Sequence, residues 1–170
     1  MYGRLQIFLM ILKKFIPYGE RQLNRELIVS IASAVFGTTD DADFLENFIP
    51  FAGRVPEPKV NAFTRYLIGG PRCLWAVYHG EQVVGFITIS DQPHTNAIGF
   101  GIKSSFSARG IMAQAWAEIK NHPCIQYPLY AYTTENNLPS RRFLERLGFE
   151  FIERMFYLGE PSLKYRKNEP

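Results

Sequence analysis

The sequence has few cysteines and histidines, and none of them has the spacing of a metal-ligand set. Only two cysteines, Cys73 and Cys124, occur among 170 residues, without a C-x-x-C pair. This disfavours a structural zinc site, and we expect two free thiols in a reducing compartment. The histidines, His79, His94 and His122, stand alone in predicted turns. We therefore expect solvated histidine side chains and no metal ion.

Long apolar runs are also lacking. The most apolar segment, residues 7–12 (IFLMIL), is far shorter than the ~20 residues that a membrane span requires. Lys13 and Lys14 follow it, and no small-residue cleavage site comes after it, which disfavours a signal peptide. We expect a buried strand or short helix at this segment, no contact with a membrane, and a cytoplasmic protein.

Charge of one sign is scarce, because the formal net charge is only +3 and the basic residues occur throughout the chain. Nucleic-acid binders usually concentrate basic residues in a stripe, so this class has little support. A hydrophobic content of 46% and an aromatic content of 15% argue against disorder. No repeat, low-complexity tract or linker interrupts the chain. Residues 1–170 are therefore expected to form a single domain.

The N-terminal third is predicted to be helical. Apolar residues recur at helical spacing over residues 21–36, and Gly37 follows as a stop signal. Thr38 or Thr39 is the expected cap of a second helix, and a third, short helix is expected over residues 58–67. The region is unusually aromatic, and a few of its aromatic side chains are expected to line an acceptor pocket: Phe44, Phe48, Phe51, Phe63 and Tyr66.

After Pro71 the pattern changes to strands. Residues 73–78 and 83–90 are β-rich and form a predicted hairpin with Gly80 in its turn, and residues 97–103 form the next strand. A helix over 109–120 follows, then a strand over 129–133 and a helix over 138–147 whose expected N-cap is Asn137. The residues of the first helix that are expected to point inward are Ile111, Met112, Ala115, Trp116 and Ile119. Residues 149–158 and 163–166 are the last predicted strands. Since a meander is antiparallel and a strand–helix–strand crossover returns a parallel neighbour, we expect an α/β (α+β) mixed sheet with helices on both faces.

The segment over residues 102–115 (IKSSFSARGIMAQA) joins a strand to a helix through small residues. A helix N-terminus offers unpaired N–H groups and the positive end of the helix dipole, which together bind phosphate, and Gly110 lets a ligand approach the backbone. A glycine at such a junction is also compatible with an ordinary turn. Five cations could gather around a bound anion: Lys103, Arg109, Arg141, Arg142 and Arg146.

Three motifs in order resemble the GNAT superfamily of N-acetyltransferases. Residues 108–115 (ARGIMAQA) are similar to the G-K-G-I/Y-M-T-E-A cofactor loop of the branch that acetylates ribosomal-protein N-termini. Asn137 and Ser140 match the N-x-x-S box of that branch, and residues 147–149 match its L-G-F ending. Residues 98–100 (IGF) fit the preceding strand, so the resemblance covers roughly residues 73–158.

The resemblance implies a single-domain, mostly antiparallel GNAT sheet with a central splay that holds acetyl-CoA. The pantetheine arm would pair with backbone near Ile102 and Ser104, and Asn137 would bond to the cofactor near its thioester. No metal is implied. The pyrophosphate would lie on the loop and helix start, with Arg142 nearby; the loop residues are Ser107, Ala108, Arg109, Gly110, Ile111, Met112 and Ala113.

The implied reaction is direct transfer of an acetyl group from acetyl-CoA to a primary amine of a small molecule or a protein N-terminus. Many relatives protonate the leaving thiolate with a tyrosine, but Leu144 stands at that position, so Ser140 is the candidate acid. The candidate bases are Glu135, Tyr132 and Tyr130, or a chain of waters. Each of these residues also has an ordinary structural interpretation. Ser140 is compatible with a hydroxyl in the first turn of a helix, Glu135 with a surface turn residue, and the two tyrosines with half-buried strand residues.

An alternative hypothesis is a catalytically degenerate protein that keeps the fold as a CoA-binding or scaffold protein. Its motivation is the missing tyrosine and the presence of Asn96 and Ala97 where relatives often carry glutamate. The acceptor cannot be named from the sequence, and both a monomer and a homodimer are compatible with it.

Overall fold

The computed structural model describes residues 13–16, 20, 24–36, 64, 66–91, 96–157 and 160–170. Several predicted features lie outside these residues: the apolar run 7–12, the helix expected from Thr38 or Thr39, most of residues 58–67, four aromatic residues of the N-terminal third (Phe44, Phe48, Phe51, Phe63), and His94.

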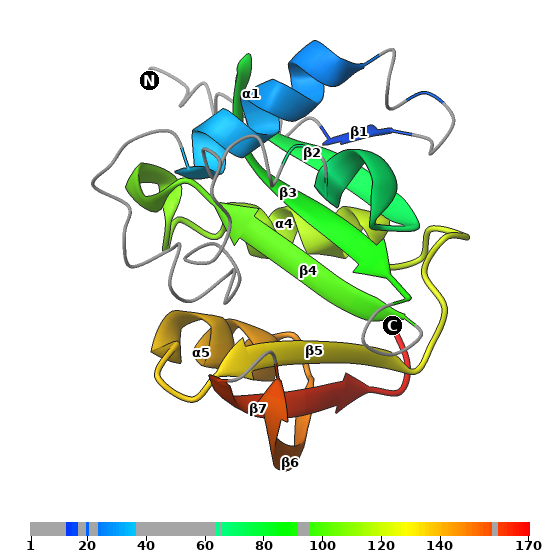
Figure 1. Cartoon of the computed structure of the whole chain (residues 1–170), viewed down its shortest axis with the longest axis vertical. Helices are drawn as coiled ribbons and strands as arrows, with labels where there is room; N and C mark the ends of the chain where they lie inside the picture. The colour runs from blue at the N-terminus through cyan, green and yellow to red at the C-terminus, as the bar shows by residue number, and fades with distance from the viewer. Residues whose placement is uncertain are drawn as a thin grey trace, which may run out of the picture.

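The described strands form one seven-stranded sheet in the order β1-β2-β3-β4-β5-β7-β6 (Figure 1). All neighbours are antiparallel except β4 and β5, which are parallel, so the expected mixed, mostly antiparallel sheet is confirmed. The strands are β1 (Lys13–Phe15), β2 (Cys73–His79), β3 (Gln82–Ser90), β4 (Ala97–Ile102), β5 (Leu129–Thr134), β6 (Glu150–Tyr157) and β7 (Glu160–Lys167).

The parallel pair β4–β5 diverges almost at once. Only Ala97↔Tyr130 and Ile98↔Ala131 are paired, after which the two strands separate (Figure 1). Beyond Ile98, β4 is paired only with β3, on its other side, as far as Ile102. The expected central splay is therefore present. Its consequence is that one edge of β4 presents backbone groups that no other described strand satisfies.

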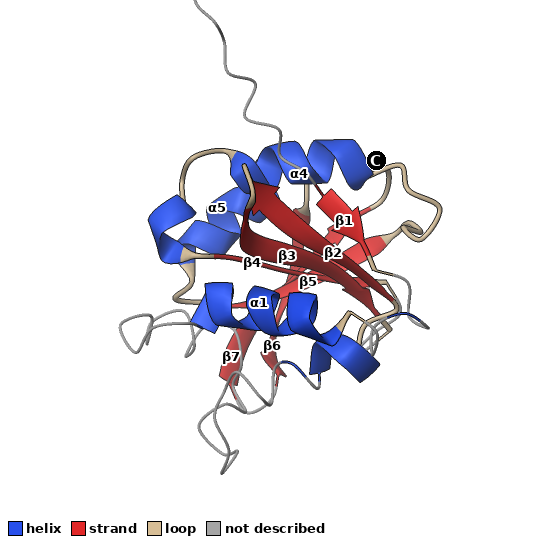
Figure 2. Cartoon of the chain, turned by 90° about the horizontal axis from the view of Figure 1, so that it is seen from above, coloured by secondary structure: helices blue, strands red, loops and turns tan. Residues whose placement is uncertain are grey.

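Helices cover both faces of the sheet (Figure 2). Helix α1 (Arg25–Phe36) packs on one face against β3, while α4 (Ile111–Ile119) and α5 (Leu138–Arg146) lie on the other face against β2 and β5. The buried residues Ile28, Ile31 and Ala32 of α1 recur at spacings of three and four, which produces a single apolar face.

The two faces of the sheet have separate cores. On the α1 face, the core includes Ile28, Ile31, Leu74 and Phe86. On the α4/α5 face, the larger core includes all the residues predicted to point inward from α4; these are Ile111, Met112, Ala115, Trp116 and Ile119. The chain thus builds its double-sided core from strands that are apolar on both faces, as the unbroken burial of residues 73–77 shows.

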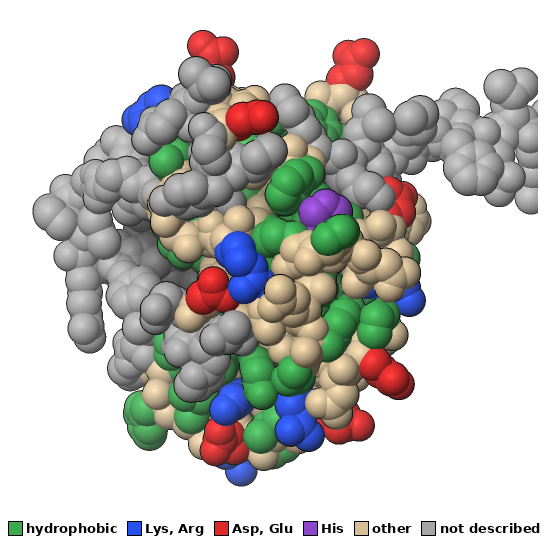
Figure 3. Space-filling view, turned by 90° about the vertical axis from the view of Figure 1, so that its right-hand side faces the viewer, with side chains coloured by type: hydrophobic (Ala, Val, Ile, Leu, Met, Phe, Trp, Pro, Cys, Tyr) green, Lys and Arg blue, Asp and Glu red, His purple; other side chains and the backbone are tan. Residues whose placement is uncertain are grey.

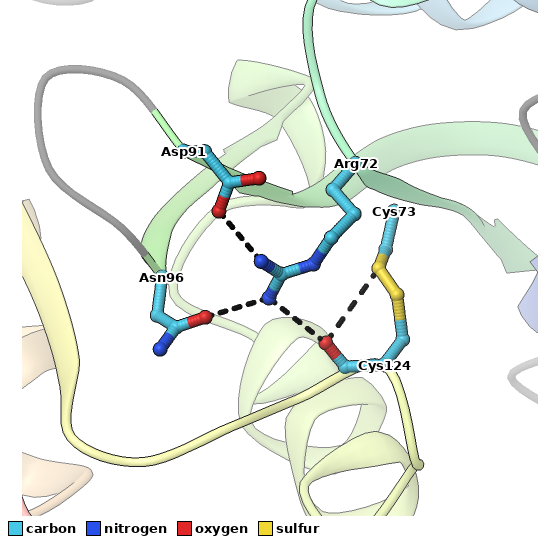
Figure 4. A network of polar contacts seen from close by, with 5 residues as sticks. All are labelled: Arg72, Cys73, Asp91, Asn96 and Cys124. Atoms are coloured by element: carbon cyan, nitrogen blue, oxygen red, sulfur yellow. Dashed lines mark hydrogen bonds and ion pairs between the residues drawn. A yellow bond between two sulfur atoms is a disulfide. The ribbon is translucent and has the colours of Figure 1, made fainter.

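One arginine connects several segments at the end of the sheet where β4 and β5 begin. The Arg72 guanidinium forms an ion pair with Asp91, donates to Asn96 Oδ1 at 2.6 Å, and donates to the Cys124 carbonyl oxygen at 3.2 Å (Figure 4). The Asn96 carbonyl in turn accepts from the Tyr130 backbone N–H at 3.0 Å. Arg72 therefore holds Asp91 and Asn96, which lie at the end of β3 and the start of β4, next to Cys124 in the loop before β5.

The expectation of two free thiols is wrong. The structure joins Cys73 and Cys124 in a disulfide beside Arg72, with their Cα atoms 6.5 Å apart (Figure 4). The start of β2 and the α4–β5 loop meet at the same end of the sheet, although 51 positions separate the cysteines in the chain. The cysteines therefore do not indicate a reducing compartment.

Two further expectations need correction. Helix α4 begins at Ile111, not at Arg109, because its N-cap Gly110 adopts a positive φ of 77° that cannot belong to a helix. His79 and His122 are not solvated turn residues. Their rings pack against Phe106 and against Phe15 and Trp75, respectively. Within the described ranges, no helix is long and apolar enough to cross a bilayer.

We expect Arg72→Ala to lower the free energy of unfolding by about 2–3 kcal/mol, because it removes a guanidinium that bonds to three partners. Arg72→Lys should retain little of this energy, since one ammonium group cannot reach all three acceptors in the same geometry. Urea denaturation measures both values. The control is Arg154→Ala: Arg154 is 78% exposed, and among the described residues its ion-pair partner is Glu135, so the change should be below about 0.5 kcal/mol. An equal loss in both alanine variants would contradict the role of Arg72.

Candidate functional site

A short loop connects the diverging end of β4 to the start of α4. The 3-10 turn Ser104–Phe106 comes first. It is closed by hydrogen bonds from the Phe106 N–H to the Lys103 carbonyl and from the Ser107 N–H to the Ser104 carbonyl. Ala108 and Gly110 then adopt left-handed conformations, and Gly110 occupies the N-cap position, where it has no side chain to cap the helix. Gly110 is suited to this position, because a residue with a Cβ is strained at a φ of 77°.

The first N–H groups of α4 have no hydrogen-bond acceptor within the helix. No side chain of the described residues caps it, and the first intrahelical bond runs from the Gln114 N–H to the Gly110 carbonyl at 3.0 Å. The N–H groups of residues 111–113 therefore lack intrahelical acceptors and point along the positive end of the helix dipole. A Cβ built on Gly110 would have only Gln114 Nε2 within 4 Å, at 3.9 Å, so the approach to this backbone is open. A helix start with these features is suited to an anion.

Phe106 holds the loop from both sides of its ring. The His79 ring at the end of β2 lies 5.1 Å from it, and the Arg109 guanidinium lies 5.2 Å from its centroid. The cation–π contact keeps the Arg109 charge beside the exposed loop backbone. Phe106 is not among the site residues expected from the sequence. The only signal for it was a large aromatic residue inside a segment of small ones.

The start of α5 lies across the gap from this loop, directly after β5. Asn137 is the N-cap, as predicted, and its Oδ1 accepts from the Ser140 N–H at 3.2 Å. Within the described part of the chain, neither the Asn137 amide nitrogen nor the Ser140 hydroxyl has a partner, so both remain available to a ligand. Phe143, one turn further on, contacts Phe100 of β4 with ring centroids 4.8 Å apart. This aromatic pair joins β4 to α5 past the point where the strands separate.

Glu135 and Tyr132, the other predicted catalytic residues, lie at the end of β5. Glu135 Oε1 pairs with Arg154 Nε at 2.9 Å, and the Glu135 carbonyl accepts from Arg141 Nη1 at 3.1 Å. Burial, reinforced by the neighbouring Tyr130, raises the pKa of Tyr132 above its ordinary value. Tyr132 therefore stays neutral at physiological pH, which makes its phenol a proton donor rather than a base.

The predicted cofactor-binding residues lie on both sides of the gap between β4 and β5. Ile102 and Ser104 are at the diverging end of β4, and Arg142 is exposed on α5. Ile111 and Met112 are 4% and 7% exposed, so they can offer only backbone groups to a ligand. The remaining predicted cofactor contacts are exposed or half-buried: Ser107, Ala108, Arg109, Gly110, Ala113, Asn137 and Ser140.

The described residues offer no cluster of metal ligands, and the face seen in Figure 3 carries mixed charge. No group of three or more His, Cys, Asp or Glu side chains among them could hold a metal ion. Figure 3 shows acidic and basic side chains interspersed with apolar ones on the face that lies to the right in Figure 1. On this face, charge of one sign is not gathered into a patch.

A family comparison matches this architecture. The sequence model described as "Acetyltransferase (GNAT) family" matches residues 42–149. The chain belongs to the GNAT acetyltransferase family. No curated protein sequence matches the chain. The splay between β4 and β5 and the uncapped start of α4 are thus features of a GNAT fold.

Solved structures share the fold at low sequence identity. RimL, the ribosomal L7/L12 alpha-N-protein acetyltransferase in complex with coenzyme A, is 14% identical, with a TM-score of 0.59 over 96% of this chain and 97% of that chain. The ribosomal-protein-S5-alanine acetyltransferase from Vibrio fischeri is 16% identical, with a TM-score of 0.58 over 92% of each chain. A GCN5-related N-acetyltransferase from Brucella melitensis is 16% identical, with a TM-score of 0.64 over 98% of this chain and 77% of that chain.

We expect Gly110→Ala to lower the free energy of unfolding by about 1–2 kcal/mol, because a Cβ strains the left-handed conformation without meeting a clash. Thermal and urea unfolding measure the loss. Gly69→Ala is the matched control: its Cβ would have no atom within 4 Å, and its φ is not positive, so stability should not fall. A Gly110→Ala protein as stable as the wild type would show that position 110 does not need glycine.

Proposed function

We propose that this GNAT protein is an acetyl-CoA-dependent N-acetyltransferase that transfers an acetyl group to a primary amine of a small molecule or a protein N-terminus. The observation that carries the proposal is the gap between β4 and β5, which leads to the uncapped N-terminus of α4. A strand edge suits the amides of a pantetheine arm, and a helix start suits a pyrophosphate. The coenzyme A bound to RimL, a protein of the same fold, adds support.

The proposed cofactor contacts follow from this geometry. The edge of β4 near Ile102 and Ser104 would pair with the arm, and the N–H groups of residues 107–113 would hold the pyrophosphate. Arg109 and Arg142 would add positive charge around it. Acetyl-CoA supplies an activated thioester carbonyl, and the chain's main task is to position the amine and stabilise the developing oxyanion.

Ser140 is the proposed acid for the leaving thiolate. Its backbone N–H is fixed by Asn137, so its Cα is held at the start of α5 while its hydroxyl keeps a free proton to donate. Asn137 would use its remaining amide protons on the cofactor near the thioester. In this arrangement the cap positions both side chains at once.

Glu135 is the proposed base, acting directly or through water. Its partner Arg154 is 78% exposed, so the ion pair between them is weak and can open. Tyr132 has the opposite property, because burial raises its pKa and keeps the phenol protonated. We therefore assign Tyr132 a hydrogen-bonding role toward the acceptor or the thioester oxygen, not proton abstraction.

A degenerate CoA-binding or scaffold protein is the second candidate, and particular residues favour it. Leu144 stands where relatives carry the catalytic tyrosine; it is 1% exposed and belongs to the core. Asn96 stands near the usual glutamate position, and its side chain is occupied by Arg72. Both positions have structural uses, so catalysis depends on Ser140 and its neighbours.

Saturating acetyl-CoA or CoA should raise the thermal stability, by about 2.7 kcal/mol at a hundredfold excess over Kd. Gly110→Asp should abolish the shift, because a carboxylate at the helix start repels a pyrophosphate. Gly110→Asn is the matched control, since it has similar size and tolerates positive φ but carries no charge. The absence of a shift in the wild type would contradict the cofactor assignment. A shift without CoA release over a panel of amines and peptides would favour the scaffold.

Ser140→Ala should lower kcat roughly a hundredfold and leave the Kd for CoA nearly unchanged, since proton donation is lost while the backbone bond to Asn137 remains. Steady-state kinetics and calorimetry separate the two effects. The control is Ser30→Ala, a helical serine on α1 whose hydroxyl donates to the Glu26 carbonyl, and this variant should keep its kcat. An unchanged kcat in Ser140→Ala would remove the acid role.

A further inference from the structure

Thr133 presents a polar atom to the α4/α5 face of β5, where its neighbours are apolar. Alternation along the strand places its side chain on the face of Leu129 and Ala131, and its partner on β7 is Leu163. Leu129, Ala131 and Leu163 all belong to the large core on that face. Thr133 itself is 7% exposed, so the side chain is almost fully removed from water.

The Thr133 hydroxyl has no hydrogen-bond partner in the described structure. A buried hydroxyl without a partner is unfavourable, and a valine of the same shape would avoid the loss. Thr88 of β3 shows the ordinary case: it is 0% exposed, and its hydroxyl donates to the Gly99 carbonyl at 3.3 Å. The unpartnered hydroxyl of Thr133 therefore calls for an acceptor or donor from outside the chain.

The position of Thr133 in the sheet indicates where that partner would lie. The last β4–β5 pair is Ile98↔Ala131, and Thr133 is two residues further along β5 on the same face as Ala131. This is the level of Phe100 on β4, which is already separated from β5 and contacts Phe143 of α5. The hydroxyl is thus at the beginning of the gap, beside an apolar aromatic pair that offers no hydrogen bond.

We propose that Thr133 is a cofactor-binding residue whose hydroxyl donates a hydrogen bond to an amide carbonyl of the pantetheine arm. The inference rests on the proposed use of acetyl-CoA and assigns a contact that none of the recognised motifs contains. An amide carbonyl is the fitting partner because a strand-like arm in this gap presents amide groups at intervals, and each buried carbonyl needs a donor. Thr133 then contributes to the binding of the pantetheine arm and not to the binding of the nucleotide part of CoA.

The test uses Thr133→Val and Thr133→Ser in the full chain. Thr133→Val should raise the Tm of the ligand-free protein by about 2 °C, because it removes an unpartnered hydroxyl. Calorimetry should show the Kd for CoA rising about fivefold, while the Kd for adenosine 3′,5′-bisphosphate, which lacks the arm, stays unchanged. Thr133→Ser keeps the hydroxyl and should keep wild-type affinity for CoA.

Thr88→Val is the matched control for stability. It deletes a buried hydroxyl that has a partner, so its Tm should fall, in the opposite direction to Thr133→Val. A destabilised Thr133→Val protein with unchanged CoA affinity would show an internal partner and overturn the proposal. Equal weakening of CoA and the bisphosphate would also overturn it, since the effect would not come from the arm.

The remaining outcomes separate this inference from the proposed function. If the wild type binds CoA and Thr133→Val binds it equally well, Thr133 has no role in binding, while the use of acetyl-CoA stands. If the wild type binds neither CoA nor the bisphosphate, the proposed function fails and the assignment of Thr133 fails with it.

Discussion

The pairing between β4 and β5 stops after Ile98 and Ala131, and much of the molecule is arranged around that interruption. A sheet normally satisfies the backbone groups of its inner strands, so a gap between two central strands leaves one edge of β4 in need of partners. The closed end of the gap is fixed from several directions, by Arg72, by the Asn96 carbonyl that accepts from Tyr130, and by the disulfide. The separation is thus anchored at one end and open at the other.

The open end of the gap is shaped mainly by backbone. The left-handed conformations at Ala108 and Gly110 turn the chain from β4 into α4, and Phe106 fixes the loop between the His79 ring and the Arg109 guanidinium. Backbone N–H groups need no particular side chain to bind a phosphate. This explains how the loop can keep its shape although Ala108 stands where the motif that it resembles has glycine.

The same physics decides how much could be predicted from the sequence. Periodicity and turn residues were sufficient for the meander, for α5 with its Asn137 cap, and for the buried face of α4, because these depend on local pattern. The predicted start of α4 at Arg109 is two residues early, because the sequence does not show that Gly110 adopts a left-handed conformation and becomes the N-cap. The disulfide, the Arg72 contacts and the Phe106 contacts join residues that only the sheet brings together. The lack of a partner for the Thr133 hydroxyl also cannot be predicted from the sequence, because it depends on where β4 separates from β5.

The start of α5 combines a structural role with groups that could bind or react. Asn137 Oδ1 is committed to the Ser140 N–H, so the cap that begins the helix also sets where the Ser140 hydroxyl and the Asn137 amide protons lie. Asn137 can therefore serve as a helix cap and as a ligand contact at once, because the cap uses neither the Asn137 amide protons nor the Ser140 hydroxyl. Leu144 differs, because its burial in the core leaves it nothing to contribute to chemistry. Under the proposed function, catalysis therefore depends on the Ser140 hydroxyl at the α5 cap and on Glu135 and Tyr132 at the end of β5.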